Sequence, residues 1–266
     1  MNKIGVLGCG WVGLPLAENL IREGYSVKGT STSSEKVNKL SKLGVIAYNY
    51  TMDEKGAKNS LFFKSIDTLV ITIPFAKKNK KFIDFNKSIN ELVKIIEKES
   101  ISNVIYLSSI SVYGAQDGDI NESKSCIPDS INGIQILKIE HLINKGSFIT
   151  TNIRLGGLIG ADRHPINSLT GKRFNKGNEY INLIHQTDVL GILLKVIKKL
   201  NFKNVTYNAV SPYHPSKKEY YTQIAIQKKI APPIFTNEKG NKKIINSSKL
   251  IKELGYTFKI KNLLID

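Results

Sequence analysis

Three glycines near the start of the chain are spaced for binding the phosphates of a dinucleotide. Gly8, Gly10 and Gly13 form the pattern G-x-G-x-x-G between a predicted strand, residues 3–7, and a predicted helix, residues 14–21. The first glycine permits a tight turn, the second lets the backbone approach a pyrophosphate, and the third lets the helix pack on the strand. The helix N-terminus adds N–H groups and a partial positive charge. We therefore predict a cofactor loop of Gly8, Gly10, Trp11, Val12 and Gly13.

The end of the second predicted strand bears on which dinucleotide binds. Sites selective for NAD usually have an Asp or Glu there, which holds the 2′-hydroxyl of the ribose. This chain has Ser31 and Thr32, followed by Lys36, and these groups suit a 2′-phosphate better than a carboxylate would. The sequence thus favours NADP over NAD as the cofactor. A structural alternative is that Ser33 or Ser34 caps the next helix, and both roles are compatible.

Further cofactor contacts are expected at the ends of later strands, because ligands of parallel α/β sheets lie beyond the carboxyl ends of the strands. The apolar run at residues 67–74 is typical of a strand that is buried on both faces. The predicted contacts that follow strands are Asp53, Ile73, Pro74, Ser108 and Gly157.

A doubly wound sheet could position all of these residues. Strand-like and helix-like segments alternate up to residue 160, which predicts an α/β Rossmann-type fold with a parallel sheet of about six or seven strands. Beyond that point the alternation fails and polar, turn-forming residues become frequent. We therefore expect a dinucleotide-binding domain at residues 1–160 and a smaller substrate lobe at residues 161–266, with residues 180–200 returning to the Rossmann sheet.

The composition indicates a globular chain with a basic surface. The 266 residues include 39 Lys and Arg against 22 Asp and Glu, which gives a net charge of +17, and 41% are hydrophobic. The lysines are spread along the chain, and the densest cluster, residues 77–81, lacks the aromatic side chains that stack on bases. A solvated basic surface is therefore favoured over a specific nucleic-acid site.

The sequence also carries expectations about location and metals. Apolar runs fall short of the roughly 20 residues that a membrane span needs, and the N-terminus lacks a basic leader with a cleavage site. Cys9 and Cys126 are the two cysteines, which make no disulfide framework and fit a reduced cytoplasm. The cysteines and the four histidines lack the spacing of metal ligands. We predict a cytoplasmic protein without a membrane segment or a metal.

Several motifs together resemble those of one family across nearly the whole chain. Besides the glycine turn they are SSISVYG at residues 108–114, RLGGLIG at 154–160 and NLIHQTDV at 182–189. They are similar to motifs of the extended short-chain dehydrogenase/reductase family, in its epimerase/dehydratase branch. The short length, the G-x-G-x-x-G spacing and RHP at residues 163–165 resemble more closely the small atypical subgroup of the YeeZ type. The resemblance implies NAD(P) binding and a nucleotide-sugar-like or other hydroxy or keto substrate.

The resemblance also implies a catalytic Ser, Tyr and Lys. In that family the Tyr exchanges a proton, the Lys lowers the pKa of the Tyr and holds the ribose, and the Ser orients the substrate oxygen. Ser109 matches the Ser, but Asn132 stands where the Tyr belongs and Ile136 where the Lys belongs. An amide exchanges no proton and an isoleucine carries no charge, so these replacements remove the family's proton-transfer pair.

Other side chains could replace the missing pair. Tyr113 could reach the same crevice as Ser109, and these two are the catalytic candidates. His164 and His185 are candidate bases, because histidine exchanges protons most readily near neutral pH. Arg163, His164 and His185 are expected at the substrate, where Arg163 and His164 would hold an anionic group.

Two functions from different classes follow from these residues. The leading hypothesis is an NAD(P)-dependent oxidoreductase of the epimerase or dehydratase type. The alternative is a non-catalytic NAD(P)-binding sensor that acts through a partner, and it is motivated by Asn132 and Ile136. Either protein could be a monomer or a homodimer.

Overall fold

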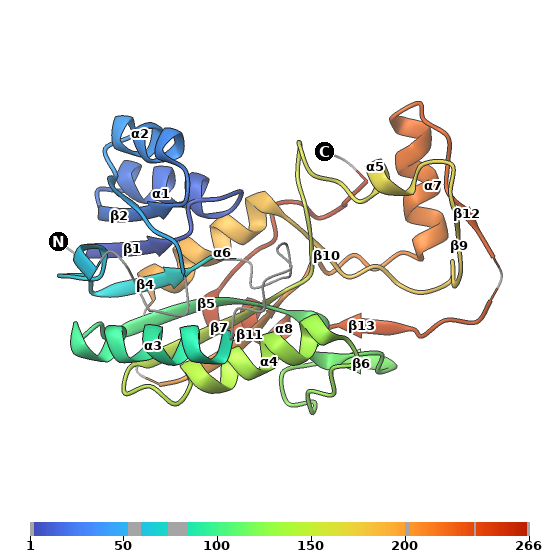
Figure 1. Cartoon of the computed structure of the whole chain (residues 1–266). Coiled ribbons are helices and arrows are strands. Elements are labelled where there is room, and N and C mark those ends of the chain that lie inside the picture. Colours follow the sequence, from blue (N-terminus) through green and yellow to red (C-terminus); the bar gives the residue numbers. More distant parts are fainter. Residues whose placement is uncertain (1–2, 53–59, 74–84, 200–202, 237, 265–266) are drawn as a thin grey trace.

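A sheet of seven parallel strands forms the centre of the computed structural model, which describes residues 3–52, 60–73, 85–199, 203–236 and 238–264 (Figure 1). In spatial order the strands are β3 (Ile46–Asn49), β2 (Ser26–Ser31), β1 (Lys3–Leu7), β4 (Thr68–Ile71), β5 (Asn103–Ser109), β7 (Ile149–Leu155) and β11 (Val205–Ala209). The winding reverses between β1 and β4, as in dinucleotide-binding sheets. The predicted α/β Rossmann-type fold is confirmed.

Helices cover both faces of this sheet. One face carries α1 (Gly13–Arg22), α2 (Ser34–Lys42), α6 (Gln186–Lys198) and α8 (Ser248–Leu254), and the other carries α3 (Phe85–Lys98) and α4 (Ile131–Ile143). Each face buries an apolar layer, with Leu16 and Ile192 on the first and Ile89, Leu92 and Ile139 on the second. All four residues of β4 are buried, which explains why its sequence is apolar without alternation.

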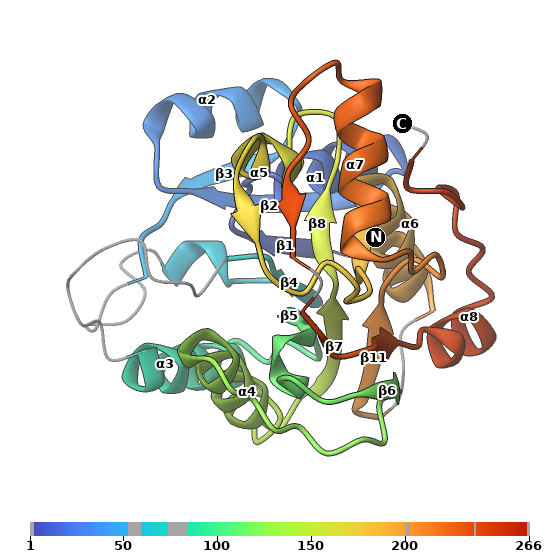
Figure 2. The ribbon, with the colours of Figure 1, turned by 90° about the vertical axis from the view of Figure 1, so that its right-hand side faces the viewer.

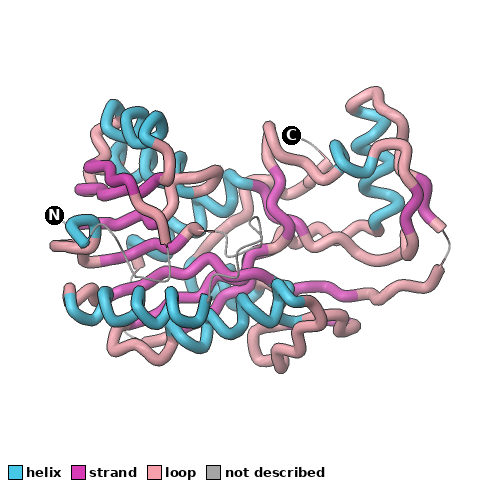
Figure 3. The backbone as a smooth tube through the Cα atoms, viewed as in Figure 1, coloured by secondary structure: helices cyan, strands magenta, loops and turns pink. Residues whose placement is uncertain are grey.

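A small lobe lies beyond the carboxyl ends of the strands (Figure 2). It contains α5 (Ile166–Leu169), β9 (Arg173–Phe174), α7 (Lys217–Gln227) and β12 (Ile234–Phe235), connected largely by loops (Figure 3). The lobe has an apolar core of its own around Tyr220, Tyr221 and Ile224. Ser216 and Glu219 form a reciprocal capping box that fixes the start of α7.

Two short strand pairings connect the lobe with the sheet. β8 (Gly157–Ile159) pairs with β10 (Leu183–His185), and β6 (Gly118–Ile120) pairs with β13 (Lys243–Ile245). After β10 the chain returns to the sheet layer, because α6 packs on α1 and β11 adds the seventh strand. Residues beyond 160 therefore contribute to both the lobe and the sheet layer. Two short 3-10 turns, η1 (Ser60–Phe62) and η2 (Ile110–Tyr113), lie in the connections after β3 and β5. Within the described ranges, no helix has the length and apolar character needed to cross a membrane.

Candidate functional site

The glycine loop between β1 and α1 is held in a conformation that requires glycine at two positions. Gly8 has a φ of +102°, its N–H donates to Thr30 Oγ1 at 2.8 Å, and its carbonyl accepts from Thr72 Oγ1 at 2.5 Å. A Cβ at Gly13 would lie 2.3 Å from the carbonyl oxygen of Gly8. Any side chain at either position would therefore displace the strand-to-helix turn.

Gly10 differs from the other two glycines because it faces open space. A Cβ built there would meet nothing within 4 Å. The first turn of α1 has no acidic residue, and its N-cap residue, Val12, makes no side-chain capping bond within the described part of the chain. A helix N-terminus of this kind favours a nearby anion, because of its helix dipole and the N–H groups of its first turn.

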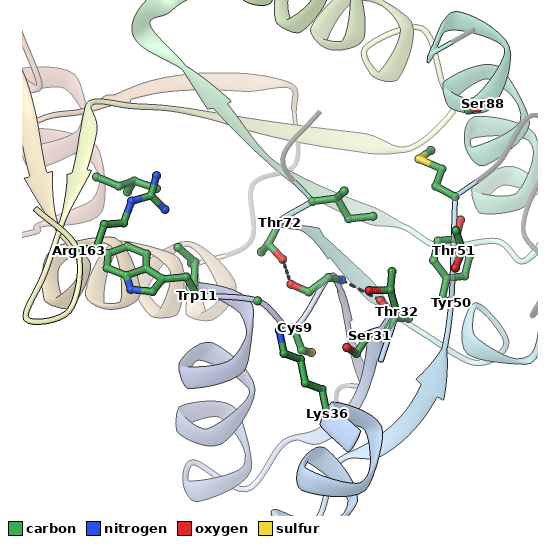
Figure 4. Close-up of a pocket in the computed structure, with 17 residues that line it drawn as sticks. Cys9, Trp11, Ser31, Thr32, Lys36, Tyr50, Thr51, Thr72, Ser88 and Arg163 are labelled. Atoms are coloured by element: carbon green, nitrogen blue, oxygen red, sulfur yellow. Dashed lines mark hydrogen bonds between the residues drawn. The ribbon is translucent and has the colours of Figure 1, made fainter. Parts of the chain in front are cut away.

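The loop forms one wall of a cavity of 480 Å³ (Figure 4). The other walls come from the end of β2, from residues 50–52 after β3, from Thr72 and Ile73 after β4, and from Leu158 and Arg163 on the lobe side. The cavity thus lies at the carboxyl edge of the sheet, where the winding reverses and α/β sheets bind their ligands.

The charges of this cavity favour an anionic ligand. Lys36 and Arg163 line it, and the lining residues that the structure describes include no Asp or Glu. Such an excess of cations raises the local concentration of a polyanion. Asp53 and Pro74, which the sequence assigns to this site, lie outside the described residues.

Residues at and just after the end of β2 have two roles, because some cap the next helix and others line the cavity. Ser33 caps α2 by accepting the N–H of Lys36, so the cap predicted from the sequence is confirmed. Ser31, Thr32 and the Lys36 side chain meanwhile line the cavity. The two roles coexist because different groups perform them.

Cys9 borders the cavity without being a reactive thiol. Burial raises the pKa of Cys9 to about 12, and its Sγ points to the carbonyl oxygen of Val6 at 3.8 Å. The thiolate is the nucleophilic form of cysteine, so this residue stays protonated and unreactive near neutral pH. Its side chain forms part of the cavity wall.

Ser108, at the end of β5, belongs to a buried ionic network. Its hydroxyl donates to Glu140 of α4, and Glu140 forms an ion pair with Arg154 of β7 at 2.7 Å. Ser108 is 4% exposed and Glu140 is 2% exposed. The Ser108 hydroxyl therefore forms its hydrogen bond inside the protein. Gly157, the other predicted contact in this region, is exposed beside Leu183.

Tyr113 continues this network. Its hydroxyl donates to Asn208 Oδ1 at 2.8 Å and accepts from Arg154 Nη1 at 2.9 Å, and the guanidinium lies 4.9 Å from the ring centroid. The side chain is fully buried, and burial raises the pKa of Tyr113 even though Arg154 acts in the opposite direction. Because of these contacts, Tyr113 packs in the protein interior and anchors η2, the turn after β5.

Asn132 and Ile136, which the sequence motif aligns with the family's Tyr and Lys, belong to α4, and this helix packs on η2. Ser109 is half-buried and caps η2, where its Oγ accepts the N–H of Ser111 at 3.1 Å. Asn132 is exposed in the first turn of α4, and Ile136 packs on the apolar cluster around Tyr113. Neither a phenol nor an ammonium stands at these two positions.

The two predicted histidines lie apart from the first cavity. His164 is buried in the lobe, where its Nε2 lies 2.9 Å from Tyr220 Oη and its Nδ1 accepts the N–H of Ile166. His185 caps α6 by accepting the N–H of Thr187. Neither is among the described residues that line the cavity, whereas Arg163 is. Among the described residues, no cluster of His, Cys, Asp and Glu could hold a metal ion.

A second cavity, of 410 Å³, lies between η2 and the lobe. Its lining includes Ser111, Asp129 and an ion pair between Lys217 and Glu179. Lys243 donates to the carbonyl oxygen of Gly114 at 2.6 Å, and burial lowers the pKa of Lys243. These charged residues come from distant segments of the chain, so no motif or spacing in the sequence identifies them.

The fold and the first cavity define a Rossmann-type protein with the architecture of NAD-binding epimerases. Residues 3–118 match the family described as the NAD binding domain of 6-phosphogluconate dehydrogenase. MoeE5 in complex with UDP-glucose and NAD has a TM-score of 0.81 at 17% identity, over 99% of this chain and 95% of that chain. UDP-glucuronic acid 4-epimerase from Bacillus cereus, in complex with UDP-glucuronic acid and NAD, has a TM-score of 0.80 at 19% identity, over 98% and 96%. These similarities show a common fold.

Sequence similarity shows the family. The chain is 30% identical to Protein YeeZ from Escherichia coli (strain K12) over 271 residues, which cover 100% of this chain and 98% of that protein. The chain therefore belongs to the YeeZ family. The resemblance in the sequence motifs is consistent with this membership, and the resemblance to epimerases is supported at the level of the fold.

Proposed function

We propose that this chain binds NADP or NAD, with a preference for NADP, and uses it on a small hydroxy or keto substrate such as a nucleotide sugar. The observation that carries the proposal is the cavity at Gly10, which joins a helix N-terminus to two cations. The phosphate groups of a dinucleotide are bound well by this combination. The family match over residues 3–118 and the NAD complexes of the structural neighbours support it.

The preference for NADP is inferred from the adenosine end of the cavity. Ser31, Thr32 and Lys36 offer two hydroxyls and an ammonium to a 2′-phosphate, which makes strong charge-assisted hydrogen bonds. Lys36 also lies in the first turn of α2, where the helix dipole favours negative charge. These groups would hold NADP more tightly than NAD.

The second cavity is the proposed substrate site. Leu158 of β8 lines the first cavity, while Leu183 of β10, the pairing partner of Gly157, lines the second. The two cavities therefore adjoin the same strand pair, and a substrate in one would lie close to a nicotinamide in the other. Residues 1–160 would hold the cofactor and the lobe from residue 161 onward would enclose the substrate. The UDP-sugars bound by the structural neighbours suggest a nucleotide sugar as the substrate class.

Ser109 is the proposed group that orients the substrate oxygen. We expect Ser109→Ala to lower turnover about 10²- to 10³-fold, because it removes one hydrogen-bond donor at the reacting oxygen. The measurement is NADPH oxidation with a keto compound, or NADP⁺ reduction with a hydroxy compound, found by screening. Ser41→Ala, on the exposed side of α2, is the matched control and should leave turnover unchanged. Unchanged turnover in Ser109→Ala would remove this residue from the mechanism.

A non-catalytic NAD(P) sensor is the second candidate. It is favoured by Asn132 and Ile136, because an exposed amide and a packed isoleucine replace the proton-transfer pair. Capture of a partner that requires bound cofactor would support the sensor. Robust turnover of any hydroxy or keto compound would exclude it.

A further inference from the structure

Trp11 links the glycine loop to the lobe across a long separation in sequence. Its Nε1 donates to Asp162 Oδ1 at 2.7 Å, and its carbonyl oxygen accepts from Gln186 Nε2 at 2.6 Å. A Cβ at Gly160 would lie 2.9 Å from Trp11 Cζ2, so the backbone of the lobe approaches the indole closely. The loop that faces the cofactor phosphates is thus attached directly to the lobe.

The contact between Trp11 and the lobe also orients Arg163 toward the cavity. Gly160 and Arg163 exchange backbone hydrogen bonds of 2.8 and 3.0 Å, which form a tight turn. The Arg163 guanidinium lies 5.1 Å from the centroid of the Trp11 ring, within the range of a cation–π interaction (Figure 4). The side chain is exposed and lines the cavity together with Gly10. Stacking therefore orients the guanidinium without neutralising its charge.

We infer that Arg163 binds the pyrophosphate of the dinucleotide from the lobe side, opposite the glycine loop. This inference rests on the proposed function. A planar guanidinium matches two phosphate oxygens at once, and a preformed stack reduces the entropy lost on binding. Lys36 lies at the adenosine end and would contact the 2′-phosphate, so the two cations serve different phosphates. Arg163 is then a cofactor residue, and not the substrate residue that the sequence motif indicates.

This arrangement has a consequence for the lobe. A bound cofactor would contact Gly10 on the sheet side and Arg163 on the lobe side of the same cavity. A ligand that touches both sides stabilises the arrangement in which they are together. Cofactor binding would therefore hold the lobe in position over the neighbouring substrate cavity.

The single tryptophan of the chain, Trp11, provides a direct probe of this site. NADPH and NADH absorb where tryptophan emits, so either cofactor bound beside Trp11 quenches its fluorescence. We would titrate the wild-type protein, Arg163→Gln and Arg173→Gln with each cofactor at low and moderate salt. Arg173 is an exposed arginine on β9 of the same lobe, so its variant loses the same charge away from the cavity.

We expect Arg163→Gln to weaken the binding of NADPH and NADH by the same factor, about 10- to 100-fold, because both contain the pyrophosphate. The salt dependence of binding should also become weaker, whereas Arg173→Gln should bind as the wild type does. If Arg163→Gln and the wild type bind with equal affinity, the assignment of Arg163 is overturned, and the proposed function is unaffected. Failure of the wild type to bind either cofactor would overturn the proposed function, and with it this inference.

Discussion

Replacing Gly10 with Asp should weaken dinucleotide binding severely and leave the fold intact. The new carboxylate would project into the open cavity beside the N-terminus of α1, because a Cβ at Gly10 meets nothing within 4 Å. There it would occupy the proposed pyrophosphate position and repel the phosphates. Like charges brought together at an interface cost several kcal/mol, so we expect affinity to fall at least about 100-fold.

Calorimetric titration with NADPH measures this effect, and thermal unfolding checks the fold. Gly10→Ala is the matched control, since it adds a methyl group at the same position without a charge, and it should weaken binding far less. The melting temperature of Gly10→Asp should stay close to that of the wild type. Tight binding of NADPH by Gly10→Asp would contradict the placement of the pyrophosphate at this loop.

Removing Glu140 should destabilise the protein far more than breaking an exposed ion pair does. Arg154 donates to both carboxylate oxygens of Glu140, at 3.0 and 2.7 Å, and the two side chains are 8% and 2% exposed. Glu140→Leu would leave the guanidinium buried without its counter-ion. Breaking a buried pair in this way costs about 3–5 kcal/mol.

Denaturant unfolding of three variants tests this prediction. The double variant Glu140→Leu with Arg154→Leu should be less destabilised than Glu140→Leu, because it leaves no unpaired charge in the interior. Glu91→Gln breaks an exposed pair with Lys94 on α3 and should cost about 0–1 kcal/mol. A loss below about 1 kcal/mol for Glu140→Leu would show that Arg154 finds other partners or water.

The parts of the fold that local sequence determines could be predicted. The glycine turn is specified within six residues, since Gly8 needs a positive φ and Gly13 has no room for a Cβ. The unbroken apolar run of β4 reflects burial on both faces of the sheet. Both signals act over a short stretch of chain, so the Rossmann-type fold and the position of the glycine turn could be predicted from them.

Contacts between distant segments could not be predicted. Trp11 and Asp162 are 151 residues apart, and no spacing rule connects them. The sequence shows that Ser108 ends a strand, but the direction of its hydroxyl depends on Glu140 of a later helix. The second cavity draws Asp129, Glu179 and Lys243 from separate elements that only tertiary packing brings together.

The most direct test of the central claim is calorimetric titration of the wild-type protein with NADPH and then with NADH. We expect both to bind at one site per chain, with NADPH tighter by about tenfold, or ~1.4 kcal/mol, because the proposed contact of Lys36 is with the 2′-phosphate, which NADH lacks. Tighter binding of NADH would contradict the role given to the end of β2. The absence of binding for both cofactors would contradict the account as a whole.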